Sequence, residues 1–130
     1  MSLPALRIEM TQQNDVLVFR PVGWVAADGH VVLEEKLHEA FADGHRRMIV
    51  DLSAAHFVSS TGLGVFLYFK QILEDAGGRL VLAAPGAAVS KMLAAANLDR
   101  VLSISPTVDE AAVRARRSPG KSGRQPPAGN

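Results

Sequence analysis

One stretch of the sequence decides the fold: Ile49-Val50-Asp51-Leu52-Ser53-Ala54-Ala55-His56-Phe57-Val58-Ser59-Ser60-Thr61-Gly62-Leu63-Gly64-Val65. It begins with a short apolar run that ends in an acid, as a buried strand does. A loop follows, and then hydroxyl residues and glycines come directly before a helical pattern. Hydroxyl side chains accept hydrogen bonds from the unpaired N–H groups of a first helical turn. The stretch therefore predicts a strand, a loop and a helix with a hydroxyl-rich start, where the positive end of the helix dipole favours a phosphate.

The rest of the chain alternates strand and helix patterns on both sides of this stretch. Apolar residues at strand or helix spacing predict five strands and four helices. The strands cover residues 6–10, 16–22, 47–52, 79–84 and 101–104, and the helices cover residues 28–41, 61–76, 87–96 and 107–116. The first two strands form a hairpin, and Pro21 puts an edge or an irregularity at the end of the second. This order predicts an α/β layered domain with parallel strands in its later part.

The deciding stretch resembles the signature of STAS domains, and specifically of bacterial anti-sigma factor antagonists. In that family the signature reads roughly Asp-Leu-Ser, a spacer, and then Asp-Ser-(Ser/Thr)-Gly-Leu-Gly. Here Asp51-Leu52-Ser53 is followed, after a spacer of five residues, by Ser59-Ser60-Thr61-Gly62-Leu63-Gly64. The resemblance implies a mixed five-stranded sheet with about four helices packed mainly on one side. It covers residues 5 to 113 in the order of elements, and its specific part is confined to residues 51–64.

The same resemblance identifies a phosphorylation site. In the family the serine after the acid is phosphorylated by a partner kinase, and that position is Ser60 here. Thr61 is a secondary candidate. The sequence departs from the family pattern at Ser59, where the acid usually stands, and this departure affects how a kinase would recognise the site. A serine at this position can still cap the helix.

The signature helix carries more apolar residues than one buried face needs. Val65, Phe69 and Leu73 lie on one helical stripe, while Leu63, Phe66 and Leu67 lie on an adjoining one. One stripe packs in the core, and the other is expected to form a docking strip beside Ser60. The predicted partner-binding residues are therefore Trp24, Asp28, Ser59, Ser60, Thr61, Gly62, Leu63, Gly64 and Phe66. Trp24 and Asp28 belong to this set because they flank the loop before the first helix, which lies near the phosphosite in STAS relatives.

Composition limits the alternatives. The chain has 130 residues, 48% of them hydrophobic, and no cysteine, which fits one globular domain without disulfides or thiolate metal sites. No apolar run approaches the roughly 20 residues of a membrane span, and a cytoplasmic location is expected. The four histidines show no metal-binding spacing, and no cofactor is expected.

Charge is distributed unevenly along the chain. The last 17 residues carry five basic residues and no acid, whereas the remainder is acidic. Residues 117–130, rich in proline, glycine and basic residues, are expected to be a disordered tail that follows a domain over residues 1–116. Because the domain offers no basic stripe, direct nucleic-acid binding is not expected.

Three functions are compatible with these residues. The first is a phosphorylation-switched binding module that is not an enzyme. By resemblance, it binds an anti-sigma factor that is also a serine kinase of the histidine-kinase-like ATPase type, and a PP2C-type phosphatase reverses the modification. The second is a non-switching STAS scaffold subunit of a stress-signalling or lipid-transport ABC complex. The third reads residues 59–62 as a flavin-phosphate loop, although such a loop follows the first strand in flavodoxins. A homodimer through the apolar helix is compatible with the first two.

Overall fold

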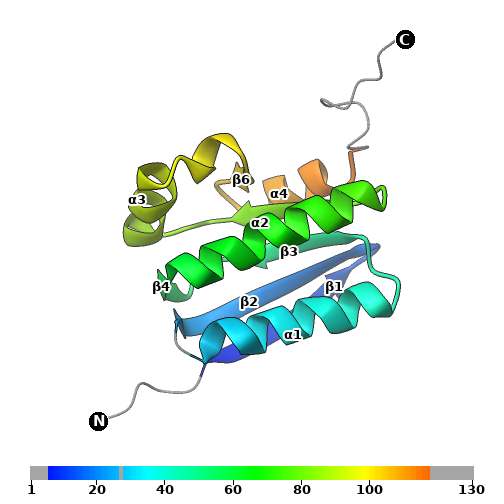
Figure 1. Ribbon diagram of the computed structural model, residues 1–130. Helices are drawn as coiled ribbons and strands as arrows, with labels where there is room; N and C mark the ends of the chain where they lie inside the picture. The colour runs from blue at the N-terminus through cyan, green and yellow to red at the C-terminus, as the bar shows by residue number, and fades with distance from the viewer. Residues whose placement is uncertain (1–5, 27, 118–130) are drawn as a thin grey trace.

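The computed structural model describes residues 6–26 and 28–117. They form one mixed sheet with helices on both faces (Figure 1). The strands are β1 (Arg7–Gln13), β2 (Val16–Val25), β3 (Arg47–Asp51), β4 (Ala55–Val58), β5 (Arg79–Ala83) and β6 (Ser103–Ser105). The helices are α1 (Gly29–Ala42), α2 (Ser60–Asp75), α3 (Ala87–Ala95) and α4 (Val108–Ala115), with a short 3-10 turn η1 at Leu98–Arg100. The predicted α/β layered domain with parallel strands in its later part is confirmed.

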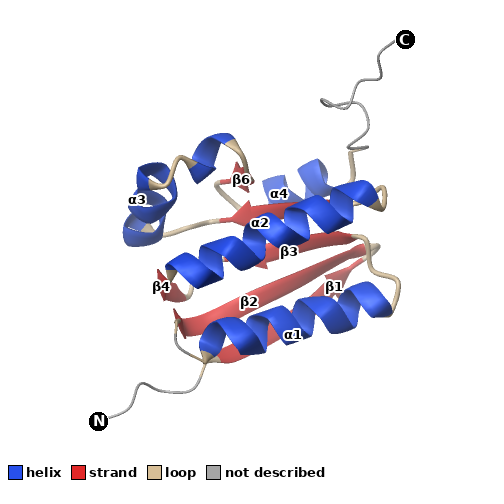
Figure 2. Cartoon of the chain, in the orientation of Figure 1, coloured by secondary structure: helices blue, strands red, loops and turns tan. Residues whose placement is uncertain are grey.

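The sheet has the order β1-β2-β3-β5-β6, and β4 pairs with β2 outside this path. β1 and β2 form the predicted antiparallel hairpin, and the other pairings are parallel (Figure 2). β2 pairs with β3 through Leu17–Phe19 and with β4 through Gly23–Val25. Pro21, which has no N–H to donate, lies between these two pairings, where a missing donor is tolerated.

The predicted number of five strands was one too few, because β4 was expected to be a loop. This strand has only four residues, and its partner is the end of β2, which was also expected to be a loop. Gly23 has a φ of +120°, and the register shifts between Gly23 and Trp24. A glycine adopts that conformation without strain, so β2 continues past the irregularity to Val25.

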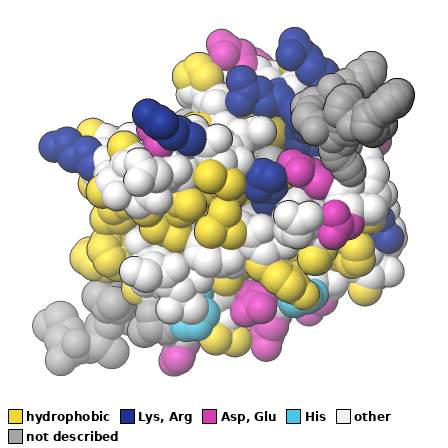
Figure 3. Space-filling model, turned by 45° about the horizontal axis from the view of Figure 1, so that its top comes forward, with side chains coloured by type: hydrophobic (Ala, Val, Ile, Leu, Met, Phe, Trp, Pro, Cys, Tyr) yellow, Lys and Arg dark blue, Asp and Glu magenta, His cyan; other side chains and the backbone are white. Residues whose placement is uncertain are grey.

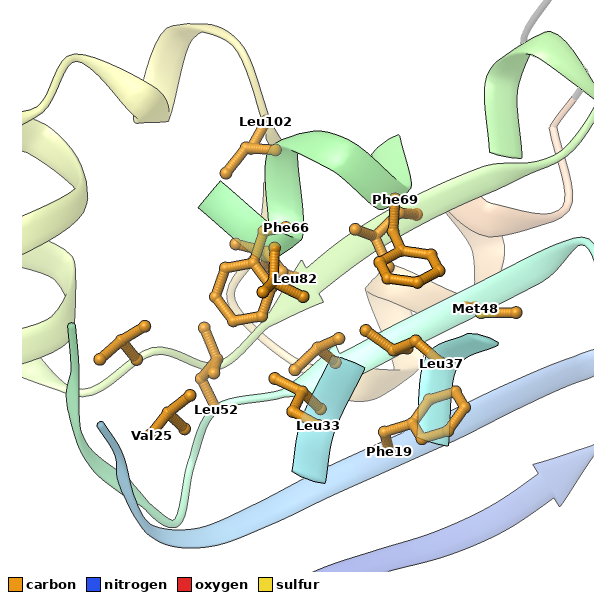
Figure 4. Packing of buried hydrophobic residues seen from close by; sticks show 14 of the residues in the cluster. Phe19, Val25, Leu33, Leu37, Met48, Leu52, Phe66, Phe69, Leu82 and Leu102 are labelled. Atoms are coloured by element: carbon orange, nitrogen blue, oxygen red, sulfur yellow. The ribbon is translucent and has the colours of Figure 1, made fainter. Parts of the chain in front are cut away.

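Three helices cover one face of the sheet and one covers the other. Buried side chains of α1, α2 and α3 form the main core with the strands, and Phe19, Leu33, Phe66 and Phe69 are among those without exposed surface (Figure 4). Alanines of α4, Ala111 among them, form a smaller cluster on the opposite face. β3 is thus covered on both sides, as its apolar sequence predicts.

The predicted tail, residues 117–130, lies outside the described residues except for Arg117, and the domain boundary at residue 116 stays a prediction. None of the helices in the described part of the chain has the length and apolar character needed to cross a membrane.

Candidate functional site: the exposed serine at the start of α2

Ser59 caps α2. Its backbone is extended, with φ −71° and ψ 168°, and its Oγ accepts a hydrogen bond from the Gly62 N–H at 3.1 Å. The Ser59 N–H in turn donates to the carbonyl oxygen of Val25, at the end of β2, at 2.8 Å. The residue is half-buried. Ser59 therefore joins the helix to the edge of the sheet and satisfies one of the unpaired N–H groups of the first turn.

Ser60 and Thr61 are the first two residues of the helix, and both are exposed. Within residues 6–26 and 28–117, no hydrogen bond involves either hydroxyl. The first turn of α2 contains no acid. Since Ser59 is the cap, the Ser60 hydroxyl is left available at the positive end of the helix dipole.

We predict that Ser59→Ala lowers the free energy of unfolding by about 1 kcal/mol, whereas Ser59→Asp leaves it nearly unchanged, since a carboxylate caps as well as a hydroxyl does. Urea denaturation of the three proteins measures the difference. If both variants lose the same free energy of unfolding, the capping hydrogen bond contributes nothing, and the loss comes from the change in side-chain shape.

Gly62 and Gly64 have different environments. A Cβ at Gly62 would lie 2.9 Å from Val58 Cγ1 and 3.1 Å from Val25 Cγ1, so only glycine lets α2 approach the β2–β4 edge this closely. A Cβ at Gly64 would have no atom within 4 Å. Gly62 is therefore required for packing, whereas Gly64 leaves the surface beside Ser60 open.

The two glycines yield a paired prediction. Alanine favours a helix over glycine by about 1 kcal/mol, so Gly64→Ala should raise the free energy of unfolding by roughly 0.5 to 1 kcal/mol. At Gly62 the two buried valines must move, at a cost of about 1 to 3 kcal/mol, and Gly62→Ala should give a net loss. Thermal and urea unfolding measure both signs. Stabilisation by both substitutions would contradict the close approach at Gly62.

Trp24 lies at the same edge. It pairs with Phe57 in the β2–β4 register, their ring centroids are 5.3 Å apart, and Trp24 is 41% exposed. Asp28 is exposed at the N-cap position of α1, and its side chain makes no capping hydrogen bond. The structure thus brings Trp24 to the edge that holds Ser59, as the resemblance implies. Asp28 does not cap α1 through its side chain, because its backbone is helical, with φ −76° and ψ −11°, rather than extended.

Leu63 and Phe66, two of the predicted partner contacts, lie in the core, with 9% and 0% exposure. The expectation that one apolar stripe of the helix stays on the surface is therefore wrong for these two residues. α2 lies against the sheet with α1 beside it, and α3 covers the region near β4 (Figures 1 and 4). Both stripes therefore pack against the core, although Leu67 stays half-buried.

The exposed side of α2 shows a residue that the sequence analysis did not select. Tyr68 is 47% exposed and lies two turns after Ser60, with its ring 5.7 Å from that of His38 on α1. Ser60, Gly64 and Tyr68 follow each other at intervals of four residues, which puts them on one side of the helix. This four-residue spacing could have identified Tyr68 from the sequence. The predicted docking strip left it out because only the more apolar residues of the helix were selected.

The Asp51-Leu52-Ser53 part of the signature supports the site from a distance. The Asp51 Oδ1 accepts the Ser53 N–H at 3.0 Å, which forms the turn between β3 and β4, and Leu52 is fully buried. Arg20 lies 3.7 Å from the Asp51 Oδ2 and also pairs with Glu9. Hydrogen bonds from Arg20 and Arg7 lower the pKa of Glu9. The motif thus sets the path of the chain from β3 into β4.

No group of histidine, aspartate and glutamate side chains within the described ranges could hold a metal ion. The protein is an α/β domain with one sheet. It presents the Ser60 hydroxyl at the start of α2, the helix that follows β3 and β4. The family model of the STAS domain matches residues 7–111 of this chain. The chain therefore belongs to the STAS domain family.

Several relatives bear names that describe a regulatory role. The chain is 26% identical over 105 residues to a Thermotoga maritima protein named as a candidate anti-sigma factor antagonist. The matched region covers 80% of this chain and 93% of the relative. The fold is similar to the crystal structure of an anti-sigma factor antagonist from Mycobacterium paratuberculosis, with a TM-score of 0.78, 24% identity, and coverage of 90% of this chain and 100% of that one. It is also similar to the Bacillus cell fate determinant SpoIIAA in its phosphorylated form, with a TM-score of 0.65, 25% identity, and coverage of 86% and 100%.

Proposed function

We propose that this protein is an anti-sigma factor antagonist, and that phosphorylation of Ser60 switches its binding. The observation that carries the proposal is the exposure of an unengaged Ser60 hydroxyl directly after a residue that already caps the helix. The names of the relatives support the same role, and one of them is known in a phosphorylated form. The unphosphorylated protein binds an anti-sigma factor in the bacterial cytoplasm and thereby releases a sigma factor.

Ser60 is a better acceptor than either neighbour. Ser59 is half-buried and its oxygen is occupied by the Gly62 N–H, so its phosphorylation would break the cap. Thr61 is exposed but lies about 100° further around the helix and carries an additional methyl group. A phosphate on Ser60 adds nearly two negative charges at the end of the helix that tolerates them, so the domain itself stays folded.

The docking surface consists of residues that remain exposed in the region of Ser60. They are Trp24 and Asp28 from the β2–α1 region and Thr61, Gly64 and Tyr68 from α2. Ser59, Gly62, Leu63 and Phe66 lie beneath this surface and hold it in place. An aromatic residue near the centre of such a patch is a frequent source of binding energy, so Trp24 and Tyr68 are the two anchors.

The protein is not itself the enzyme of this cycle. Its partner, an anti-sigma factor of the histidine-kinase-like ATPase type, transfers the γ-phosphoryl group of ATP to the Ser60 Oγ. ADP leaves, and a base of the kinase takes the hydroxyl proton. A PP2C-type phosphatase then hydrolyses the phosphoserine with water and restores the hydroxyl. This chain contributes only the acceptor and the docking surface.

Intact-mass analysis of the protein, incubated with ATP and a lysate of its own cells, tests the proposal. We expect one added phosphate in the native protein and in Thr61→Ala, and none in Ser60→Ala. Phosphate on all three proteins would place the acceptor elsewhere. If none of them is modified while native protein and Ser60→Ala retain the same partner equally, the non-switching scaffold function replaces the switch.

A further inference from the structure

β1 lies at one edge of the sheet. The strand order β1-β2-β3-β5-β6 leaves it paired on one side only, with β2. β1 contains neither lysine nor proline, and its register with β2 runs without a shift from Arg7 to Gln13. Lysine, proline and bulges are the usual features that prevent an edge strand from pairing with another strand. β1 therefore presents an unprotected row of backbone groups to a second strand.

Alternate residues of β1 supply the backbone groups that point away from the sheet. Gln13 and Val16 close a two-residue turn, so they form a hydrogen-bonded pair, and every second pair along the hairpin does the same. The odd-numbered residues of β1 thus bond to β2. Pro21 agrees with this assignment, because it has no N–H and lies opposite an even-numbered residue. The residues with outward N–H and C=O groups are Ile8, Met10 and Gln12.

The side chains at the start of β1 are complementary to a second copy of themselves. Leu6 and Ile8 pack against the main core, and Met10, on the same face, is 44% exposed. Arg7 and Glu9 lie on the opposite face and are both exposed. An antiparallel copy centred on Ile8 places Arg7 of each chain opposite Glu9 of the other. The same register places apolar residues opposite apolar ones.

The charges favour this register over its neighbours. A centre at Glu9 would put two carboxylates directly opposite each other, which is destabilising. A centre at Met10 would put Arg7 opposite the uncharged Gln13. Within one chain Glu9 already lies between Arg20, at 2.8 Å, and Arg7, at 3.3 Å. A second copy centred on Ile8 continues this alternation of charges across the edge.

The edge of β1, rather than the helices, is suited to self-association. The apolar stripes of α2 pack against the core. Acidic and histidine side chains gather on the side of the molecule where α1 lies (Figures 1 and 3). α2 packs over β5, and β2 and β3 lie between β5 and β1 in the sheet. Pairing at the β1 edge is therefore compatible with an accessible Ser60 on α2.

We propose that two copies of this chain pair antiparallel through β1, with Ile8 at the two-fold axis, and form one continuous sheet. Ile8 then exchanges two hydrogen bonds with its counterpart, and Leu6 and Met10 exchange them with each other. The two Arg7–Glu9 pairs fix the register. Because one short strand from each copy makes the contact, the interface is small, and we expect a dissociation constant of about 10 to 100 µM.

Single cysteines test the register, because the chain contains none of its own. The test variant is Ile8→Cys, and the matched controls on the same face of β1 are Met10→Cys and Gln12→Cys. At the proposed axis the two Cα atoms of residue 8 are about 5.5 Å apart, which a disulfide can span. The two copies of residue 10 are about 14 Å apart and those of residue 12 about 27 Å, which a disulfide cannot span.

The full-length variants are compared by non-reducing electrophoresis after mild oxidation at about 100 µM protein. We expect the disulfide-linked dimer to form about tenfold faster, or more, in Ile8→Cys than in either control. Met10 and Gln12 are more exposed than Ile8, so random collisions would link the controls first. Equal rates, or faster linkage in a control, overturn the proposal.

Sedimentation velocity gives a second test that leaves Ile8 in place. The native chain should change from monomer to dimer between about 1 µM and 1 mM. Arg7→Glu puts like charges opposite each other and should raise the dissociation constant by about tenfold or more. Arg100→Glu makes the same charge change at an exposed position on η1 and should behave as the native chain does. A native chain that stays monomeric up to about 1 mM, or equal dissociation constants for the two variants, overturns the proposal.

Discussion

Ser60→Glu should weaken binding to the anti-sigma factor by about 100-fold, which corresponds to roughly 3 kcal/mol, without unfolding the domain. The reason is the position of Ser60, exposed at the start of α2 with no acid in the first turn. A carboxylate there interacts favourably with the helix dipole, so the free energy of unfolding should stay equal or rise slightly. A partner packed over the same point must instead desolvate an unpaired charge. Titration calorimetry with the purified anti-sigma factor measures the affinity.

The matched control for this prediction is Ser60→Gln. Glutamine has nearly the size and shape of glutamate but no charge, so the two variants separate electrostatics from bulk. We expect Ser60→Gln to lose less than about tenfold in affinity, because a neutral amide can hydrogen-bond at an interface. An equal loss of affinity in both variants would show that the bulk of the side chain, and not its charge, weakens binding. If neither variant binds more weakly, the docking surface lies away from Ser60.

The overall fold could be predicted from the sequence because its longer elements carry clear periodicity. The hairpin, the central apolar strand and the four helices all appear near their expected positions. β4 was missed because four residues are too few to show a strand pattern. Its pairing with the end of β2 also depends on residues more than 30 positions apart in the chain, and on the irregularity at Gly23. Such a long-range pairing has no local signal.

The start of α2 was predictable, but the roles of its neighbouring hydroxyls were not. Three consecutive hydroxyl residues offer three possible caps, and sequence does not distinguish them. The structure assigns the cap to Ser59, because the hydrogen bond from its N–H to Val25 fixes where β4 ends and the helix begins. Ser60 then becomes the first helical residue, exposed rather than engaged.

Phe66→Ala should lower the free energy of unfolding by about 3 to 5 kcal/mol. Although the pattern of α2 suggested a partner contact, Phe66 has no exposed surface and packs between α2 and the sheet near Leu82 and Leu102 (Figure 4). Removing its ring loses apolar burial and leaves a cavity that rigid neighbours do not fill. Since a domain of this size is stable by roughly 5 to 15 kcal/mol, this loss is large. Urea denaturation measures it.

Tyr68→Ala is the control, because both residues are aromatic, lie on the same helix and differ in exposure. Its unfolding free energy should fall by less than about 1 kcal/mol, since 47% of the residue is already exposed and its ring lies beside those of His38 and Phe69. Binding of the anti-sigma factor should instead weaken by about tenfold or more, as expected when an exposed aromatic anchor is removed.

Phe66→Ala with native stability would show that the ring is not part of the core. Tyr68→Ala with native affinity would limit the docking surface to the first turn of α2 and the adjoining edge at Trp24. The opposite responses of two residues two positions apart would establish the rotation of α2 in solution, and with it which side of the helix a partner meets.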